Sequence, residues 1–120
     1  MIIYVDIDGT ICTRQMNLKY ENAKPLSERI EKINNLYDSG HTIIYWTARG
    51  TSTGKDWYKF TEEQLQKWGV KYHKFMTRKP EYDIFIDDKN LNAKILDGIF
   101  NIEDKAYREK EGIILKTKPV

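Results

Sequence analysis

Two short apolar runs, separated by an amphipathic stretch, set the pattern of the chain. Residues 1–5 (MIIYV) and 42–46 (TIIYW) are apolar, β-favouring segments that each run into polar residues. Such runs predict buried strands, and the first, which is uninterrupted, predicts a strand buried on both faces. Between them, four apolar residues recur at the spacing of one helical face: Leu26, Ile30, Ile33 and Tyr37.

Proline and glycine mark the expected ends of two predicted helices, of which the first carries the apolar face just described. Pro25 suits the first position of the first helix, and Gly40 suits the position just after its last turn. A second apolar stripe precedes Gly69, with the alternative that Thr61 and Gln64 form a capping box at the helix start. That stripe consists of Trp57, Phe60, Gln64, Leu65 and Trp68.

The rest of the chain continues the alternation of strands and helices. We expect short strands at residues 70–75 and 82–86, a short helix at 91–96, a helix within 103–111 and an edge strand at 112–115. Strands that alternate with helices favour right-handed crossovers and a parallel sheet. The predicted fold is therefore α/β, a three-layer sandwich around a mostly parallel, Rossmann-like sheet.

Length and composition narrow the class of protein. A chain of 120 residues fits one domain, which we assign to residues 1–120, with no room for a second substrate-binding domain. The net charge of +2 does not argue for a nucleic-acid partner. The single cysteine, Cys12, suits a reducing cytoplasm. We see neither a signal peptide nor a membrane span, so we expect a cytoplasmic protein without a membrane partner.

Two carboxylates follow the first strand, where a structural role alone explains them poorly. Asp6 and Asp8 stand at its carboxyl end, and burying an unpaired carboxylate is costly. The ends of parallel strands are also where α/β proteins bind ligands. A divalent metal held by hard oxygen ligands would satisfy both side chains. Asp8-Gly9 by itself would instead be a turn signal.

Polar residues also follow later strands. Thr47 ends the second strand, Lys79 precedes the strand expected at 82–86, and Asp87 with Asp88 follows it. Singly, these residues have plainer interpretations: a β-branched strand end, a solvated loop cation and the start of a helix. Together they predict one cluster, because the carboxyl ends of parallel strands meet at one edge of a sheet.

The segments that carry these residues resemble the haloacid dehalogenase (HAD) superfamily, mostly magnesium-dependent phosphatases. VDIDGTI, at residues 5–11, resembles the first signature of that family. The resemblance implies that Asp6 is the nucleophile and a magnesium ligand. It implies that Asp8 is the general acid and base, with its backbone carbonyl on the metal.

The later signatures follow in the same order along the chain, within residues 1–97. By the same resemblance Thr47 supplies the second-signature hydroxyl and Lys79 the lysine that offsets phosphoryl charge. Asp87 and Asp88 would complete the Mg²⁺ site, one of them directly. Ala48 and Arg49, which follow Thr47, are further candidates for substrate contact.

The gaps between signatures leave no place for an inserted cap domain. In this respect the chain resembles the capless subgroup of the family, which includes small capsule- or polysaccharide-biosynthesis phosphatases. We expect a magnesium-dependent phosphomonoesterase with an aspartyl-phosphate intermediate, acting on a small phosphorylated metabolite such as a sugar phosphate. Open alternatives are a nucleotidase, a nucleic-acid 3′-end phosphatase and a phosphate-binding module without turnover. An open site would also favour a homo-oligomer, with residues 98–120 as the interface.

Overall fold

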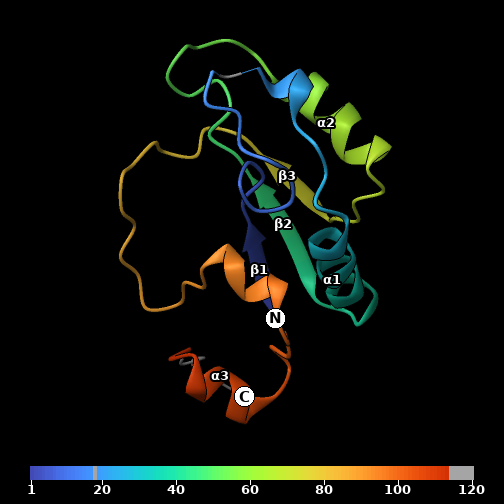
Figure 1. Ribbon diagram of the computed structural model, residues 1–120, viewed down its shortest axis with the longest axis vertical. Coiled ribbons are helices and arrows are strands. Elements are labelled where there is room, and N and C mark those ends of the chain that lie inside the picture. The colour runs from blue at the N-terminus through green and yellow to red at the C-terminus, as the bar shows by residue number, and fades with distance from the viewer. Residues whose placement is uncertain (18, 114–120) are drawn as a thin grey trace. The chain divides into compact units, whose positions relative to one another are not determined.

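The computed structural model describes residues 1–17 and 19–113, which belong to two compact units (Figure 1). The first unit, Met1–Glu81, contains three strands, two α-helices and one 3-10 helix. In chain order these are β1 (Ile2–Val5), η1 (Tyr20–Asn22), α1 (Ser27–Asp38), β2 (Thr42–Trp46), α2 (Tyr58–Lys67) and β3 (Lys74–Met76). The second unit begins at Tyr82 and contains η2 (Ala93–Asp97) and α3 (Lys105–Lys110).

The predicted α/β fold with a parallel sheet is confirmed. The strands are hydrogen-bonded in the order β1-β2-β3, and both pairs are parallel. Ile3 lies opposite Ile43, and Tyr45 lies opposite Phe75. Helices α1 and α2 each connect one strand to the next. Among the described residues, no cap domain interrupts this succession.

The two faces of the sheet differ in burial. Right-handed crossovers between strands in this order put both helices on one face, and Figure 1 shows α1 and α2 on the same side of the strands. Val5, Ile43 and Tyr45, whose side chains share one face, are buried. Ile2 and Tyr4, on the other face, are 71% and 54% exposed. The expectation that the first strand is buried on both faces is therefore wrong.

The two α-helices occur where the apolar stripes predict them. Gly40 and Gly69 follow α1 and α2 with φ of 96° and 69°, a conformation that glycine adopts at little cost. Helix α1 begins at Ser27 rather than at Pro25, because Pro25 forms an isolated bridge with Cys12. Helix α2 begins before Thr61, so the capping-box alternative is wrong.

Predictions for the later segments were less accurate. β3 is shorter than the strand expected at 70–75 and begins at Lys74. Residues 82–86 form no strand, and Ile84 and Ile86 are 80% and 94% exposed. This expectation is wrong because an apolar run becomes a strand only when another strand completes its hydrogen bonds.

The expected helices in the second unit occur in shortened form. The helix expected at 91–96 is the 3-10 helix η2, preceded by Asn92, whose side chain accepts a hydrogen bond from the Lys94 amide. The charged segment forms α3, and the Asp104 carboxylate caps its first turn. Half of the edge strand expected at 112–115 lies outside the described residues. No helix among the described residues is long and apolar enough to cross a membrane.

Candidate functional site

The loop that follows β1 turns tightly and leaves its two carboxylates at the end of the strand. The amides of Thr10 and Ile11 both donate hydrogen bonds to the Ile7 carbonyl, at 3.0 Å each. Ile7 and Ile11 are fully buried, so they anchor the loop in the core. Gly9 has φ of 81°, which permits the turn. Asp6 and Asp8 flank the buried Ile7 and remain partly accessible.

Asp6 is held loosely and stays open to solvent. Its side chain is 36% exposed, and its Oδ1 lies 3.4 Å from Lys79 Nζ. The Thr10 hydroxyl donates a long hydrogen bond of 3.5 Å to Oδ2. Burial raises the pKa of Asp6 above its ordinary value of 3.8, and the Lys79 charge opposes that increase. The carboxylate therefore has a nearby cation, and its hydrogen bond from the Thr10 hydroxyl is long.

Backbone contacts fix the positions of Thr47 and Lys79 beside this loop. The Thr47 amide donates to the Met76 carbonyl, and the Lys79 amide donates to the Thr47 carbonyl, at 3.0 Å each. Arg78 adopts φ of 64°, the left-handed region that is uncommon outside glycine. These bonds tie the segment after β3 to the end of β2. Thr47 itself is 1% exposed.

Asp8 is held far more tightly than Asp6. Arg49 donates from Nε to Asp8 Oδ2 at 2.9 Å and from Nη2 to Asp8 Oδ1 at 2.8 Å. Two parallel bonds of this kind fix both the position and the plane of a carboxylate. The Arg49 side chain is fully buried, and the Asp8 side chain is 18% exposed. The pair is therefore a buried clamp with one accessible edge.

The remaining donors of Arg49 point to other protein groups. Nη1 donates to Thr61 Oγ1 at 3.1 Å and to Gln64 Oε1 at 2.7 Å. Nη2 also lies 3.9 Å from Cys12 Sγ, and the guanidinium carbon lies 4.5 Å from the centre of the Tyr20 ring. An arginine has five N–H donors, and each of these five has a partner within the protein.

Sequence reasoning did not identify the residues that hold Arg49. Thr61 was noted only as part of a capping box with Gln64, three residues away, and Gln64 also as part of the second helical stripe. That same spacing puts them on one face of α2, where both reach the guanidinium. The Gln64 amide nitrogen also donates to the Tyr20 carbonyl at 2.8 Å, which joins α2 to η1.

Cys12 lies against this clamp but is a poor nucleophile. Its Sγ is 3.5 Å from Asp8 Oδ1, and the side chain is fully buried. Burial, with the nearby Asp8 charge, raises the pKa of Cys12 to about 12. The thiol therefore stays protonated at neutral pH, which fits a packing role in the core.

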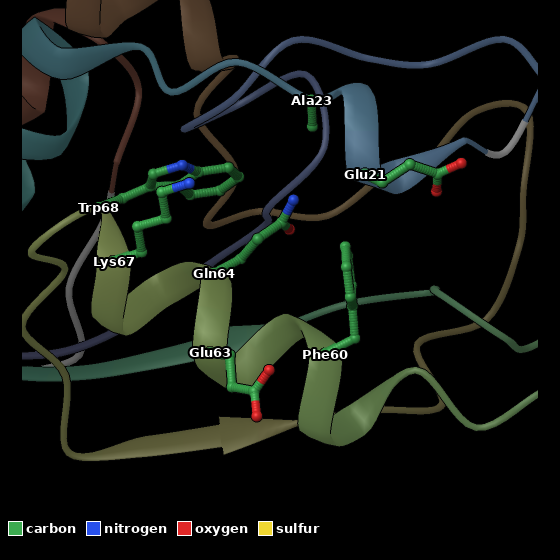
Figure 2. A pocket seen from close by; sticks show the side chains of 7 residues that line it. All are labelled: Glu21, Ala23, Phe60, Glu63, Gln64, Lys67 and Trp68. Atoms are coloured by element: carbon green, nitrogen blue, oxygen red, sulfur yellow. The ribbon is translucent and has the colours of Figure 1, made fainter.

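A surface pocket of about 250 Å³ shares Gln64 with this network. Its lining residues come from α2 with Trp68 and from the segment of η1: Glu21, Ala23, Phe60, Glu63, Gln64, Lys67 and Trp68. Figure 2 shows Gln64 between Phe60 and Trp68, with its amide pointing toward the η1 segment. Gln64 thus forms a wall of the pocket and also contacts Arg49.

The structure brings four of the predicted site residues into one region of the first unit. They are Asp6, Asp8, Thr47 and Lys79. Ala48 and Arg49 belong to the same loop, but contact of either with a substrate stays a prediction. Asp87 and Asp88 belong to the second unit, and their part in a metal site also stays a prediction.

The donor set of the first unit fits Mg²⁺ in part. No group of three or more His, Cys, Asp or Glu side chains gathers closely enough to hold an ion among the described residues of this unit. Mg²⁺ commonly uses only one or two carboxylates and retains several waters. The open carboxylate of Asp6 suits that role. The Asp8 carboxylate is engaged by Arg49, so Asp8 could offer only its backbone carbonyl.

The fold is shared with a protein of known structure. A crystal structure of a structural-genomics target from Vibrio cholerae matches 92% of this chain and 98% of its own, with a TM-score of 0.79 and 25% sequence identity. No protein-family model matches the chain, and no curated protein matches it significantly in sequence. The similarity supports the α/β fold.

Proposed function

We propose that the protein is a magnesium-dependent phosphomonoesterase that forms an aspartyl phosphate on Asp6. The observation that carries this proposal is the pairing of an accessible carboxylate with Lys79 at 3.4 Å, beside a second carboxylate that is rigidly held. A nucleophile needs an open approach, and an acid–base group needs a defined direction. The two aspartates meet these different requirements. The resemblance to the HAD superfamily assigns the same roles to them.

The reaction divides into two displacements at phosphorus. In the first, an Asp6 oxygen attacks the phosphoryl group, the ester P–O bond breaks, and Asp8 gives a proton to the departing alkoxide. In the second, Asp8 takes a proton from water, and the water oxygen attacks phosphorus. The bond between Asp6 and phosphorus then breaks, which releases inorganic phosphate and restores both carboxyl groups. No other reactant is required.

Charge neutralisation is the other requirement of phosphoryl transfer. Lys79 is 17% exposed in its side chain and lies beside Asp6, so its ammonium group can reach a phosphoryl oxygen above that carboxylate. Bound Mg²⁺ would supply further neutralisation of the phosphoryl charge. The HAD resemblance assigns the hydroxyl contact to Thr47, which accepts a backbone hydrogen bond from Lys79; its hydroxyl is buried and accepts from the Arg49 amide, so this contact needs a small local shift.

The substrate class is proposed from the absence of a cap among the described elements. An open site offers few contacts of its own, and closure is what usually excludes water and adds specificity. We propose a small phosphorylated metabolite and a homo-oligomer in which a second copy helps to wall the site. Sugar phosphates are the leading candidates, and nucleotides are the next.

The test is a substrate screen with a matched inactive variant. Sugar phosphates, nucleotides and 3′-phosphorylated oligonucleotides are incubated with wild-type protein and with Asp6→Asn, and inorganic phosphate is measured. Phosphate release by the wild type alone, fastest for small esters, supports the proposal. Equal release by both proteins would contradict the role of Asp6. A monomer by light scattering that prefers oligonucleotides would contradict the substrate and assembly proposals.

A further inference from the structure

Arg49 is a buried cation in this site, and its hydrogen-bond partners indicate its role. A phosphate-binding arginine presents free donors to the ligand, whereas every donor of Arg49 already has a protein partner. Its exposed fraction is only 3%. The side chain therefore faces Asp8 and the interior rather than an open phosphate site.

We infer that Arg49 is a positioning residue, which holds the Asp8 carboxylate in the orientation needed for proton transfer, and that Thr61 and Gln64 hold Arg49 in turn. This inference rests on the proposed function. It assigns to Arg49 an action through Asp8 rather than contact with the phosphoryl group.

The geometry makes the orientation specific. Both Asp8 oxygens accept from the guanidinium, at 2.9 and 2.8 Å, so the carboxylate cannot rotate without breaking one of these bonds. The guanidinium donates but cannot accept, so a proton on Asp8 must lie at a lone pair that Arg49 does not use. The clamp therefore selects the edge of Asp8 that exchanges protons with the leaving group and with water.

The second support of the clamp comes from α2. Thr61 and Gln64 accept from Nη1 of Arg49 at 3.1 and 2.7 Å, and the Tyr20 ring covers the guanidinium at 4.5 Å. Because Gln64 also donates to the Tyr20 carbonyl, one side chain fixes both the guanidinium and its aromatic cover. Loss of Gln64 should therefore loosen Asp8 without altering any charged group.

The kinetic test compares leaving groups. Glycerol 2-phosphate releases a poor leaving group that needs a proton, whereas 4-nitrophenyl phosphate releases a good one that does not. Arg49→Lys keeps the charge but cannot form the two parallel bonds, and Gln64→Met and Thr61→Val remove the supports. Each variant should lose about 10- to 100-fold in kcat on glycerol 2-phosphate. The nitrophenolate burst measures the phosphorylation rate on 4-nitrophenyl phosphate, and the fold-loss in that rate should be at least about tenfold smaller.

Two further readouts separate positioning from phosphate binding. If Arg49 acts through Asp8, KM for glycerol 2-phosphate and inhibition by inorganic phosphate should stay within about twofold of the wild type. Weakened phosphate inhibition in Arg49→Lys would overturn the inference and assign Arg49 to the substrate. A loss in the 4-nitrophenyl phosphate burst rate as large as the kcat loss on glycerol 2-phosphate would overturn it as well. Arg108→Lys, which alters an arginine that donates to the Ile102 and Glu103 carbonyls of the second unit, is the matched control.

A stability measurement tests the clamp without turnover. Arg49→Lys should lower Tm clearly in the wild-type background and much less in an Asp8→Asn background, because the two side chains share their bonds. Additive Tm losses would overturn the clamp even in a protein with no phosphatase activity. Conversely, an inactive wild type with a coupled pair would overturn the proposed function and leave the clamp in place.

Discussion

Asp6 and Asp8 stand two residues apart on one loop, yet their surroundings differ sharply. Asp6 is 36% exposed in its side chain and has a cation at 3.4 Å. Asp8 is 18% exposed and is fixed by two short bonds from a fully buried arginine. One carboxylate is left accessible, and the other is held rigidly. Two residues of the same type at one strand end can therefore have different chemical roles, because the neighbours of each residue set its accessibility and its freedom to move.

Removal of the nucleophile should have the largest effect. Asp6→Asn replaces the attacking oxygen by an amide, so turnover of every ester should fall to background, a loss on the order of 10⁴-fold or more. Phosphate release in steady state measures it, and acid-quenched protein incubated with ³²P-labelled ester should carry label only in the wild type. Residual labelling of the variant would show that another side chain is the nucleophile.

Metal removal should be nearly as severe. A chelator should abolish turnover and Mg²⁺ should restore it. Ca²⁺ should not, because it accepts more ligands at longer distances and can engage both Asp6 oxygens. Calorimetry of Mg²⁺ binding should also distinguish the two carboxylates. Asp6→Asn should weaken Mg²⁺ binding, and Asp8→Asn should largely retain it. Full activity with Ca²⁺ alone would contradict the metal assignment.

Loss of the acid–base group should be selective. Asp8→Asn should reduce kcat on an alkyl phosphate by about 10²- to 10⁴-fold. Formation of the aspartyl phosphate from 4-nitrophenyl phosphate should slow much less, whereas its hydrolysis should slow strongly. A burst of nitrophenolate followed by slow turnover would display both effects. Unchanged single-turnover rates on the alkyl ester would remove Asp8 from the reaction.

The two carboxamide variants should have opposite effects on stability, and these are the smallest changes expected. Asp8→Asn leaves the buried Arg49 without its counter-charge, so the free energy of unfolding should fall by roughly 2–3 kcal/mol, below the ~3–5 kcal/mol of a fully buried pair. Asp6→Asn in metal-free protein should instead raise Tm at pH 7, because burial disfavours the charged carboxylate. The increase should be only about 1–2 °C, since solvent screens the group.

The sign of the Asp6 effect follows from its pKa, which burial raises above the ordinary 3.8 in the folded protein. The folded state then holds the proton more tightly than the unfolded chain. Stability from this group is present below the unfolded pKa and is lost as pH rises through the folded pKa. The Tm advantage of Asp6→Asn should therefore shrink as pH falls from 7 toward 4. An advantage independent of pH would assign it to another cause.

Local patterns were enough to predict much of the first unit. The apolar run of β2 occurs as a strand over the predicted residues Thr42–Trp46, and Gly69 follows α2 as expected. The HAD resemblance also predicted Lys79 in the cluster with Asp6, and in the structure Lys79 follows β3 rather than preceding a fourth strand. Such features depend on periodicity and chain order, which the sequence displays directly.

Other features were decided only by tertiary structure. The apolar residues 82–86 have the composition of a strand but form none, because a strand exists only through hydrogen bonds to a neighbour that composition does not specify. The clamp on Asp8 joins residues 41 positions apart, and Thr61 and Gln64 reach Arg49 because α2 packs where it does. Sequence determined which carboxylates are available, and packing decided which of them is accessible and which is held.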